Sequence, residues 1–162
     1  DKITSSLIIP MHQLCSDMVG REVDRKEGGG GFGGDSKTYE MPGVKGKLGK
    51  LVALDLGTMK EKWSHEQEAM FLTSSLSTAG GLTFIGDLDR YFKAFDSSSG
   101  KILWQTRLSS ALLGFPITYK SQGLQFVSVT SVMGVFMAFT STVSPNIYQP
   151  DGGNAIYVFE LP

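Results

Sequence analysis

The stretch Gly80–Trp104, GGLTFIGDLDRYFKAFDSSSGKILW, carries strand and turn patterns in close succession. Short apolar and aromatic runs alternate with polar runs rich in Gly, Asp and Ser, as in antiparallel strands joined by tight turns. The predicted strands cover residues 82–85, 91–95 and 101–106, and the predicted turns cover 86–90 and 96–100. The stretch therefore predicts three strands of one small antiparallel sheet.

A second copy of this pattern lies upstream, where Val52–Trp63 matches Lys93–Trp104. Four identical residues recur at a constant offset of 41 (94 − 53 = 41): Ala53/Ala94, Asp55/Asp96, Lys60/Lys101 and Trp63/Trp104. Residues 82–85 are echoed by residues 124–127 at an offset of 42 (124 − 82 = 42). A repeat of about 40 residues made of short strands is typical of a β-propeller blade. The sequence therefore predicts an all-β propeller.

The motif Ala-x-Asp-x-x-x-Gly-Lys-x-x-Trp, complete at Ala94–Trp104, resembles the tryptophan docking motif of quinoprotein dehydrogenases. These are alcohol dehydrogenases that depend on pyrroloquinoline quinone (PQQ). The similarity extends over nearly the whole chain and includes residues 78–89, 116–119, 125–127 and the ending 152–161. The first copy departs from the family at Met59, where the family usually has Gly. The resemblance implies an eight-bladed propeller.

The chain has 162 residues, whereas eight blades of about 40 residues need roughly twice that length. We therefore expect a single incomplete propeller domain over 1–162, a C-terminal fragment with about three to four blades' worth of strands. Within it we expect a long inserted loop at 16–47, two recognisable blades at 48–129 and a closing strand at 155–161. The partners of the closing strand would lie in N-terminal blades that the chain lacks.

Composition excludes several classes of function. The net charge is −1 and 19% of residues are charged, so the chain lacks the basic surface of a nucleic-acid-binding protein. No run of 18 apolar residues occurs, so no membrane span is predicted. Cys15 is the sole cysteine, which excludes an intramolecular disulfide and a multi-cysteine zinc site.

Several residues invite a chemical interpretation that their context does not support. His12 and Cys15 could begin a metal site, but no further ligand completes it, and structural roles are favoured. The glycine-rich run 28–34 lacks the Gly-Lys-Ser/Thr and the strand–helix context of a phosphate loop, so a mobile surface loop is favoured. Asp55 and Asp96 begin turns of separate repeats and are expected to accept backbone hydrogen bonds there rather than to act as paired acids.

Three further polar residues could likewise have either a chemical or a structural role. His65 could act as a general base, but the sequence offers neither a nucleophile nor an orienting partner, so a solvated strand end is favoured. Asp87 and Asp89 flank a hairpin turn and could bind a cation. The remaining spacing of a calcium loop is missing, so turn capping is favoured.

The family resemblance indicates two cofactor-binding positions. Family members commonly carry a tryptophan just before the strand that ends Thr-Ala-Gly, and its ring forms one wall of the quinone site; the matching residue here is Leu72. A second family aromatic follows the strand that matches residues 125–129, and Phe136 is the candidate for it. Leu72 could cover a ring face by dispersion, and ordinary core packing is the alternative for both positions.

The resemblance implies oxidation of a small alcohol in the periplasm, with PQQ and calcium, or another divalent or lanthanide ion, in the full-length parent. A base would remove the hydroxyl proton, hydride would pass to the quinone, and a cytochrome-type acceptor would take the electrons. The family's metal ligands and catalytic base lie on earlier blades, so we assign no catalytic and no metal residue to this chain. We expect it to supply scaffold and a candidate wall of the site, to be inactive and to bind no cofactor alone. The alternative is a non-catalytic propeller of similar repeats that serves as a binding or assembly scaffold.

Overall fold

The computed structural model describes residues 1–23, 27–28, 33–132 and 136–161, and the side chains of 136–139 are excluded from the description. Twelve strands and one short helix are found in this part of the chain. They are β1 Ser6–His12, β2 Leu14–Gly20, β3 Gly34–Glu40, β4 Gly49–Asp55, β5 Glu61–Gln67, β6 Leu76–Ser77, β7 Leu82–Gly86, β8 Tyr91–Asp96, β9 Ile102–Arg107, β10 Ile117–Ser121, β11 Leu124–Ser131, α1 Phe136–Val143 and β12 Ala155–Leu161. The all-β prediction is confirmed.

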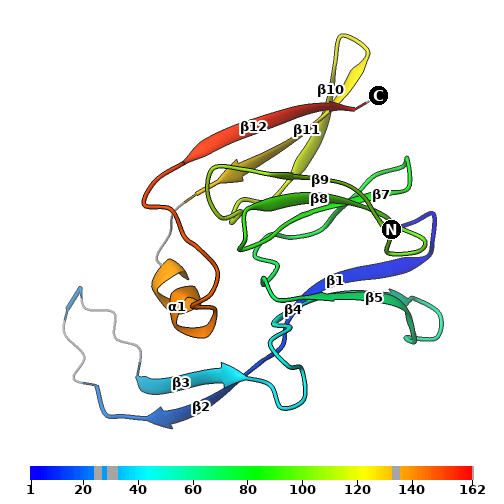
Figure 1. Cartoon of the computed structure of the whole chain (residues 1–162). Helices are drawn as coiled ribbons and strands as arrows, with labels where there is room; N and C mark the ends of the chain where they lie inside the picture. The colour runs from blue at the N-terminus through cyan, green and yellow to red at the C-terminus, as the bar shows by residue number, and fades with distance from the viewer. Residues whose placement is uncertain (24–26, 29–32, 133–135, 162) are drawn as a thin grey trace.

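Three antiparallel sheets make up the body of the molecule (Figure 1). The first has the strand order β1-β4-β5, the second β6-β7-β8-β9 and the third β10-β11-β12. β2 and β3 form a separate two-stranded ribbon. In the sequence this ribbon is inserted between β1 and β4, which pair with each other in the first sheet. In Figure 1 the three sheets lie one above another, with the second sheet in the middle.

The second sheet contains the three strands that the turn pattern predicts. β7, β8 and β9 agree with the predicted ranges to within one residue at each end, and β6 adds a short fourth strand at the β7 edge. The strands pair as successive antiparallel neighbours. Local turn chemistry therefore specifies both the strand boundaries and their order.

The two sequence repeats have the same backbone geometry. A register shift falls between Ala53 and Leu54 in the first copy and between Ala94 and Phe95 in the second. Each copy then turns at its aspartate: Asp55 N–H donates to Lys60 O at 2.8 Å, and at the offset of 41 Asp96 N–H donates to Lys101 O at 2.8 Å. The repeat in the sequence is thus a repeat of structure down to single hydrogen bonds.

Each turn is closed by its aspartate carboxylate. Asp96 Oδ1 accepts hydrogen bonds from the backbone N–H groups of Ser98 at 3.0 Å and Ser99 at 2.8 Å. Asp55 Oδ1 accepts the corresponding bonds in the first copy. Hydrogen bonds from the Ser98 and Ser99 hydroxyls and the Ser99 backbone lower the pKa of Asp96 from 3.8 to about 2. Both aspartates therefore have the structural role that the sequence predicts.

Apolar side chains fill the two spaces between the sheets. The core between the first and second sheets consists of Ile8, Leu51, Ala53, Trp63, Phe71, Ile85 and Phe95. The core between the second and third sheets consists of Phe84, Phe92, Ala94, Leu112, Val127 and Val129. β7 and β8 of the middle sheet are therefore buried on both faces, which explains their nearly continuous apolar character.

Trp63 fastens the first sheet to the second. Its indole N–H donates to Ser97 O at 3.0 Å, and its ring stacks on Phe95 with an interplanar angle of 6°. The turn residue Gly100 has φ +71°, and a Cβ atom there would lie 2.4 Å from the Trp63 ring. Only glycine permits this approach, which explains the glycine of the repeated motif. The predicted stacking between blades is confirmed for Trp63.

Trp104, the equivalent residue of the second copy, is less enclosed. It is 40% exposed and contacts Phe159 of β12 edge to face at 5.2 Å. No turn covers it among the residues that the structure describes. A groove of about 460 Å³ lies beside it, lined by Leu82, Phe84, Trp104, Phe159, Glu160 and Leu161. β12 pairs with β11 along one edge only in the described part of the chain.

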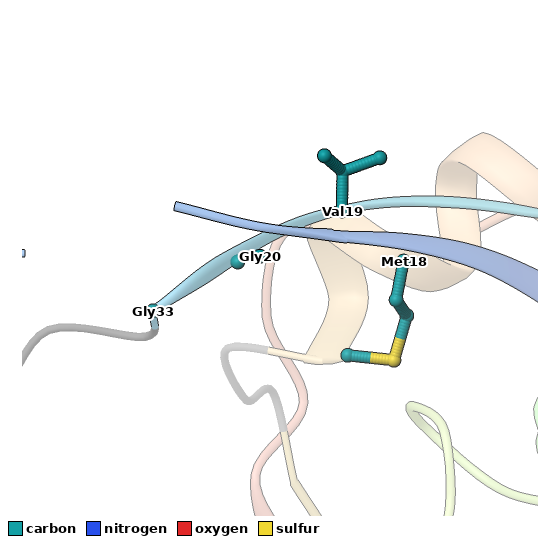
Figure 2. Close-up of a pocket in the computed structure, with 5 residues that line it drawn as sticks. Met18, Val19, Gly20 and Gly33 are labelled. Atoms are coloured by element: carbon teal, nitrogen blue, oxygen red, sulfur yellow. The ribbon is translucent and has the colours of Figure 1, made fainter. Parts of the chain in front are cut away.

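The segment expected as a loop over 16–47 contains a β-ribbon. β2 and β3 pair from Leu14–Glu40 to Gly20–Gly34, and a hollow of about 230 Å³ lies at the outer end of the ribbon. Figure 2 shows that Met18 and Val19 point to opposite faces there, as successive strand residues do. Among the described residues the hollow is lined by Met, Val and Gly alone, and these supply no polar side chain for chemistry. In the described chain no helix is long and apolar enough to span a membrane.

The Gly100→Ala substitution tests the docking of Trp63. Its Cβ would collide with the indole ring and would also occupy a left-handed conformation, so we expect a loss of about 2–4 kcal/mol in the free energy of unfolding. Gly123→Ala is the matched control, because Gly123 has φ +84° with no atom within 4 Å of its Cβ position. Urea unfolding measures both variants, and equal losses would contradict the docking role of Gly100.

Acid titration tests the aspartate turns. Because the folded pKa of Asp96 is about 2, below its ordinary 3.8, its contribution to stability is complete above about pH 4 and is lost as the pH falls toward 2. We expect Asp96→Asn to make stability fall less steeply with acid in this window. Asp151→Asn, an exposed control, should leave the pH profile of the unfolding midpoint unchanged. Identical profiles for the wild type and Asp96→Asn would exclude the turn role.

Candidate functional site

A third apolar cluster lies at one end of the sheets, where the ribbon and α1 are inserted. Its buried members are Leu48, Ala69, Met70, Leu88, Ala111 and Ile147, and Leu14, Leu72 and Val143 pack against them. These residues come from the start of the β2 ribbon strand, from the connections next to strands of the first and second sheets, and from α1 and the connection that follows it. We call this group the end cluster. It is the place where segments distant in sequence converge, so it is the candidate functional end of the molecule.

Leu72 is the side chain that the segment 69–73 leaves partly exposed. Ala69, Met70, Phe71 and Thr73 are all buried. Leu72 is half-buried and packs on the end cluster. The structure therefore places this sequence-predicted residue at the candidate functional end, with part of its surface open.

Four hydrogen bonds fix the segment on both sides of Leu72. They run from Gln67 Nε2 to Ala69 O (2.7 Å), from Leu88 N to Met70 O (2.9 Å), from His12 Nε2 to Phe71 O (2.8 Å) and from Gly86 N to Thr73 Oγ1 (2.9 Å). Since a carbonyl oxygen only accepts, His12 must carry its proton on Nε2. His12 thus has the structural role that the sequence favours, and the backbone around Leu72 is held from two sheets.

Phe136, the second sequence-predicted position, is the first residue of α1. Its side chain lies outside the described part of the structure. The same helix contributes Val143 to the end cluster, so α1 and the Leu72 segment meet at one end of the molecule.

A polar network that the sequence analysis did not find lies behind this segment. Lys93 and Asp87 are almost fully buried, and Lys93 Nζ lies 2.6 Å from Asp87 Oδ2. Gln67, from the first sheet, donates to the same carboxylate oxygen at 3.0 Å and accepts a short hydrogen bond from Lys93. Asp87 Oδ1 accepts the Tyr91 backbone N–H at 2.9 Å. Asp87 therefore caps its turn, as predicted, and also balances a buried cation.

His65 lies beside this network, and the prediction of a solvated strand end is wrong. Its ring contacts Phe95 edge to face at 5.2 Å and lies 6.4 Å from Phe71. Burial lowers the pKa of His65 below its ordinary 6.5, and the positive charge of Lys93 makes a smaller contribution in the same direction. Strand alternation places His65 on the same inner face as Trp63 and Gln67, while Ser64 and Glu66 between them face outward.

Metal-ligating side chains do not gather in the described part of the chain. No group of three or more His, Cys, Asp or Glu residues is placed to hold an ion there. Asp89, the second turn carboxylate, pairs with Arg107 across the turn. What the end cluster offers is one apolar wall on a rigidly held segment.

Asp87→Asn tests the buried network. The substitution leaves the Lys93 ammonium buried without its counter-charge, so we expect a loss of about 3–5 kcal/mol in unfolding free energy. Asp89→Asn is the matched control: it weakens the more exposed pair with Arg107 and should cost less than about 1 kcal/mol. Denaturant unfolding compares them. A loss for Asp87→Asn as small as that of the control would show that the network contributes no stability.

The chain is similar to curated alcohol dehydrogenases over almost its full length. It is 31% identical over 160 residues to a quinoprotein ethanol dehydrogenase of Pseudomonas aeruginosa, covering 98% of this chain and 25% of that relative. It is 32% identical over 131 residues to a lanthanide-dependent methanol dehydrogenase of Methylorubrum extorquens, covering 81% of this chain and 22% of the relative. The chain thus spans about a quarter of the length of the curated relatives it matches.

Solved structures agree with this similarity. A europium-containing methanol dehydrogenase superposes with a TM-score of 0.86 at 27% identity, covering 99% of this chain and 32% of that one. The antiparallel sheets described above therefore match part of a PQQ propeller, and the predicted fold class is confirmed. The family model described as the glucose, ethanol and alcohol dehydrogenase β-propeller domain, named PQQ, matches residues 36–127. The chain belongs to the PQQ-dependent dehydrogenase β-propeller family.

Proposed function

We propose that this chain is the C-terminal part of a quinoprotein alcohol dehydrogenase and supplies scaffold and one wall of its PQQ site. The observation that carries the proposal is the segment 69–73, whose backbone is fixed by hydrogen bonds from two sheets while Leu72 stays partly open. A wall of a cofactor site needs such a rigid backbone with one exposed side chain. Phe136, at the start of α1, is the second residue that we assign to this wall.

An apolar wall is compatible with one face of a planar quinone. The Leu72 side chain can contact a ring by dispersion, though it lacks the stacking energy of an aromatic residue. PQQ, when bound, accepts the hydride of an alcohol. The role of residues 69–73 is to hold the ring at a fixed height and to exclude water from one side of it.

The metal and the remaining catalytic groups belong, in this proposal, to the N-terminal blades of the parent. Calcium is the expected ion, and another divalent ion or a lanthanide is equally compatible, since the relatives include a lanthanide-dependent enzyme. The parent would oxidise a small alcohol in the periplasm. A cytochrome-type protein would accept its electrons, as the name of one relative, methanol dehydrogenase [cytochrome c] subunit 1, states for that enzyme.

A non-catalytic binding or assembly scaffold is the second candidate. One observation favours it: the wall position carries Leu72 where the resemblance leads us to expect tryptophan. A propeller that had lost its quinone would have no need of an aromatic wall, while its sheet packing would be kept.

Absorbance titration of PQQ in the presence of calcium tests the assignment of the other groups to the parent. We expect no micromolar binding by the 162-residue chain, because one wall does not supply the convergent contacts that a site needs. Micromolar binding by the chain alone would show that a complete site lies within it.

A chimera distinguishes the two candidate functions, part of a dehydrogenase and non-catalytic scaffold. This chain would replace the corresponding part of the Pseudomonas aeruginosa quinoprotein ethanol dehydrogenase, which is 31% identical. We expect the chimera to bind PQQ, and Leu72→Ala to weaken binding by about tenfold through lost apolar contact. Leu124→Ala, at the exposed leucine that begins β11, should leave the affinity unchanged. A folded chimera without PQQ binding would favour the scaffold.

A further inference from the structure

Arg90 has a charged side chain that no described residue neutralises. It lies in the turn between β7 and β8 and has a left-handed backbone with φ 71°. Its guanidinium Cζ lies 5.4 Å from the ring centre of Tyr148, which covers it from the connection between α1 and β12. Among the residues that the structure describes, no Asp or Glu forms an ion pair with Arg90. Its near neighbour Asp89 is occupied by Arg107.

The Nε donor of Arg90 also forms no hydrogen bond with the described residues. Arg90 Nε is buried and has no hydrogen-bond partner among the residues that the structure describes. A buried donor of a charged group costs stability when it is left unpaired, so such a group calls for an acceptor. Arg90 as a whole residue is half-buried.

The facing connection carries two further buried polar atoms, Ser144 Oγ and Gln149 Oε1, for which the described part of the chain supplies no partner. The connection and the turn are in contact, because Gln149 Nε2 lies 3.4 Å from Leu88 O and Tyr148 covers Arg90. Ser144 is 5% exposed. Among the described residues, unsatisfied polar atoms thus occur on both segments: the donor Arg90 Nε on the turn, and Ser144 Oγ and the acceptor Gln149 Oε1 on the connection.

We propose that Arg90 binds a carboxylate between the β7–β8 turn and the connection 144–149. The planar guanidinium presents parallel N–H donors that match the two oxygens of a carboxylate. The turn residues 89 and 90 with Arg107 carry one net positive charge, which a singly charged carboxylate neutralises and a doubly charged phosphate exceeds. Tyr148, which is 66% exposed, is free to move aside so that the ligand reaches Nε. This site does not depend on the quinone proposal.

Equilibrium dialysis of the 162-residue chain against radiolabelled acetate tests this site at constant ionic strength. We expect one site per chain of roughly millimolar affinity, as befits a single bidentate contact. Arg90→Gly should weaken binding by about tenfold or more. Glycine adopts φ 71° without strain, so this variant removes the guanidinium while sparing the turn.

Two lysine variants distinguish bidentate hydrogen bonding by the planar guanidinium from attraction by its positive charge alone. Arg90→Lys keeps the charge but loses the planar fork, so we expect a several-fold loss of affinity. Arg107→Lys is the matched control and should bind acetate as the wild type does. Unchanged binding in Arg90→Gly, or wild-type affinity in Arg90→Lys, would overturn the proposal. Phosphate competing more strongly than formate would overturn the assignment to carboxylates.

Discussion

The packing of Trp63 against Gly100 is the contact on which the arrangement of the sheets depends. An indole ring can approach a backbone turn this closely only where the turn has no Cβ atom, and the left-handed backbone of Gly100 aims the turn at the ring. The indole N–H simultaneously satisfies Ser97 O. One apolar contact and one hydrogen bond thus set the distance and the angle between the first two sheets. The core residues beneath them then pack in a space of defined width.

That width determines what can be buried between the sheets. The Lys93–Asp87–Gln67 network and His65 occupy the same space as the aromatic core, at the end nearer to Leu72. Buried charges are tolerated only with their partners in place, and Gln67 and Asp87 come from different sheets. A change in sheet spacing would separate them. The rigidity of the segment 69–73 therefore depends on docking at Trp63 as well as on its own hydrogen bonds.

The sequence predicted the parts of this structure that local chemistry determines. β7, β8 and β9 were found because Gly, Asp and Ser mark their turns, and the docking role of Trp63 was found because the motif repeats. The β2–β3 ribbon was missed because residues such as Ser16 and Asp17 alternate without an apolar face, since both faces of the ribbon are exposed. His65 was misplaced because charged neighbours concealed its inward position. The unpaired state of Arg90 has no signal in the sequence, since it depends on a connection almost 60 residues away.

Met59 makes the two turns of the repeat differ in whether a tryptophan can pack on them. It occupies the place in the first turn that Gly100 has in the second, with a positive φ of 56° and a side chain that is 60% exposed. A tryptophan cannot settle on this turn as Trp63 does on the next, because a Cβ atom fills the space. Two copies of this chain therefore cannot join by inserting Trp104 of one into the first turn of the other. A repeat protein that exposed both a docking tryptophan and a turn able to accept it would polymerise head to tail. The side chain of Met59 removes the accepting turn.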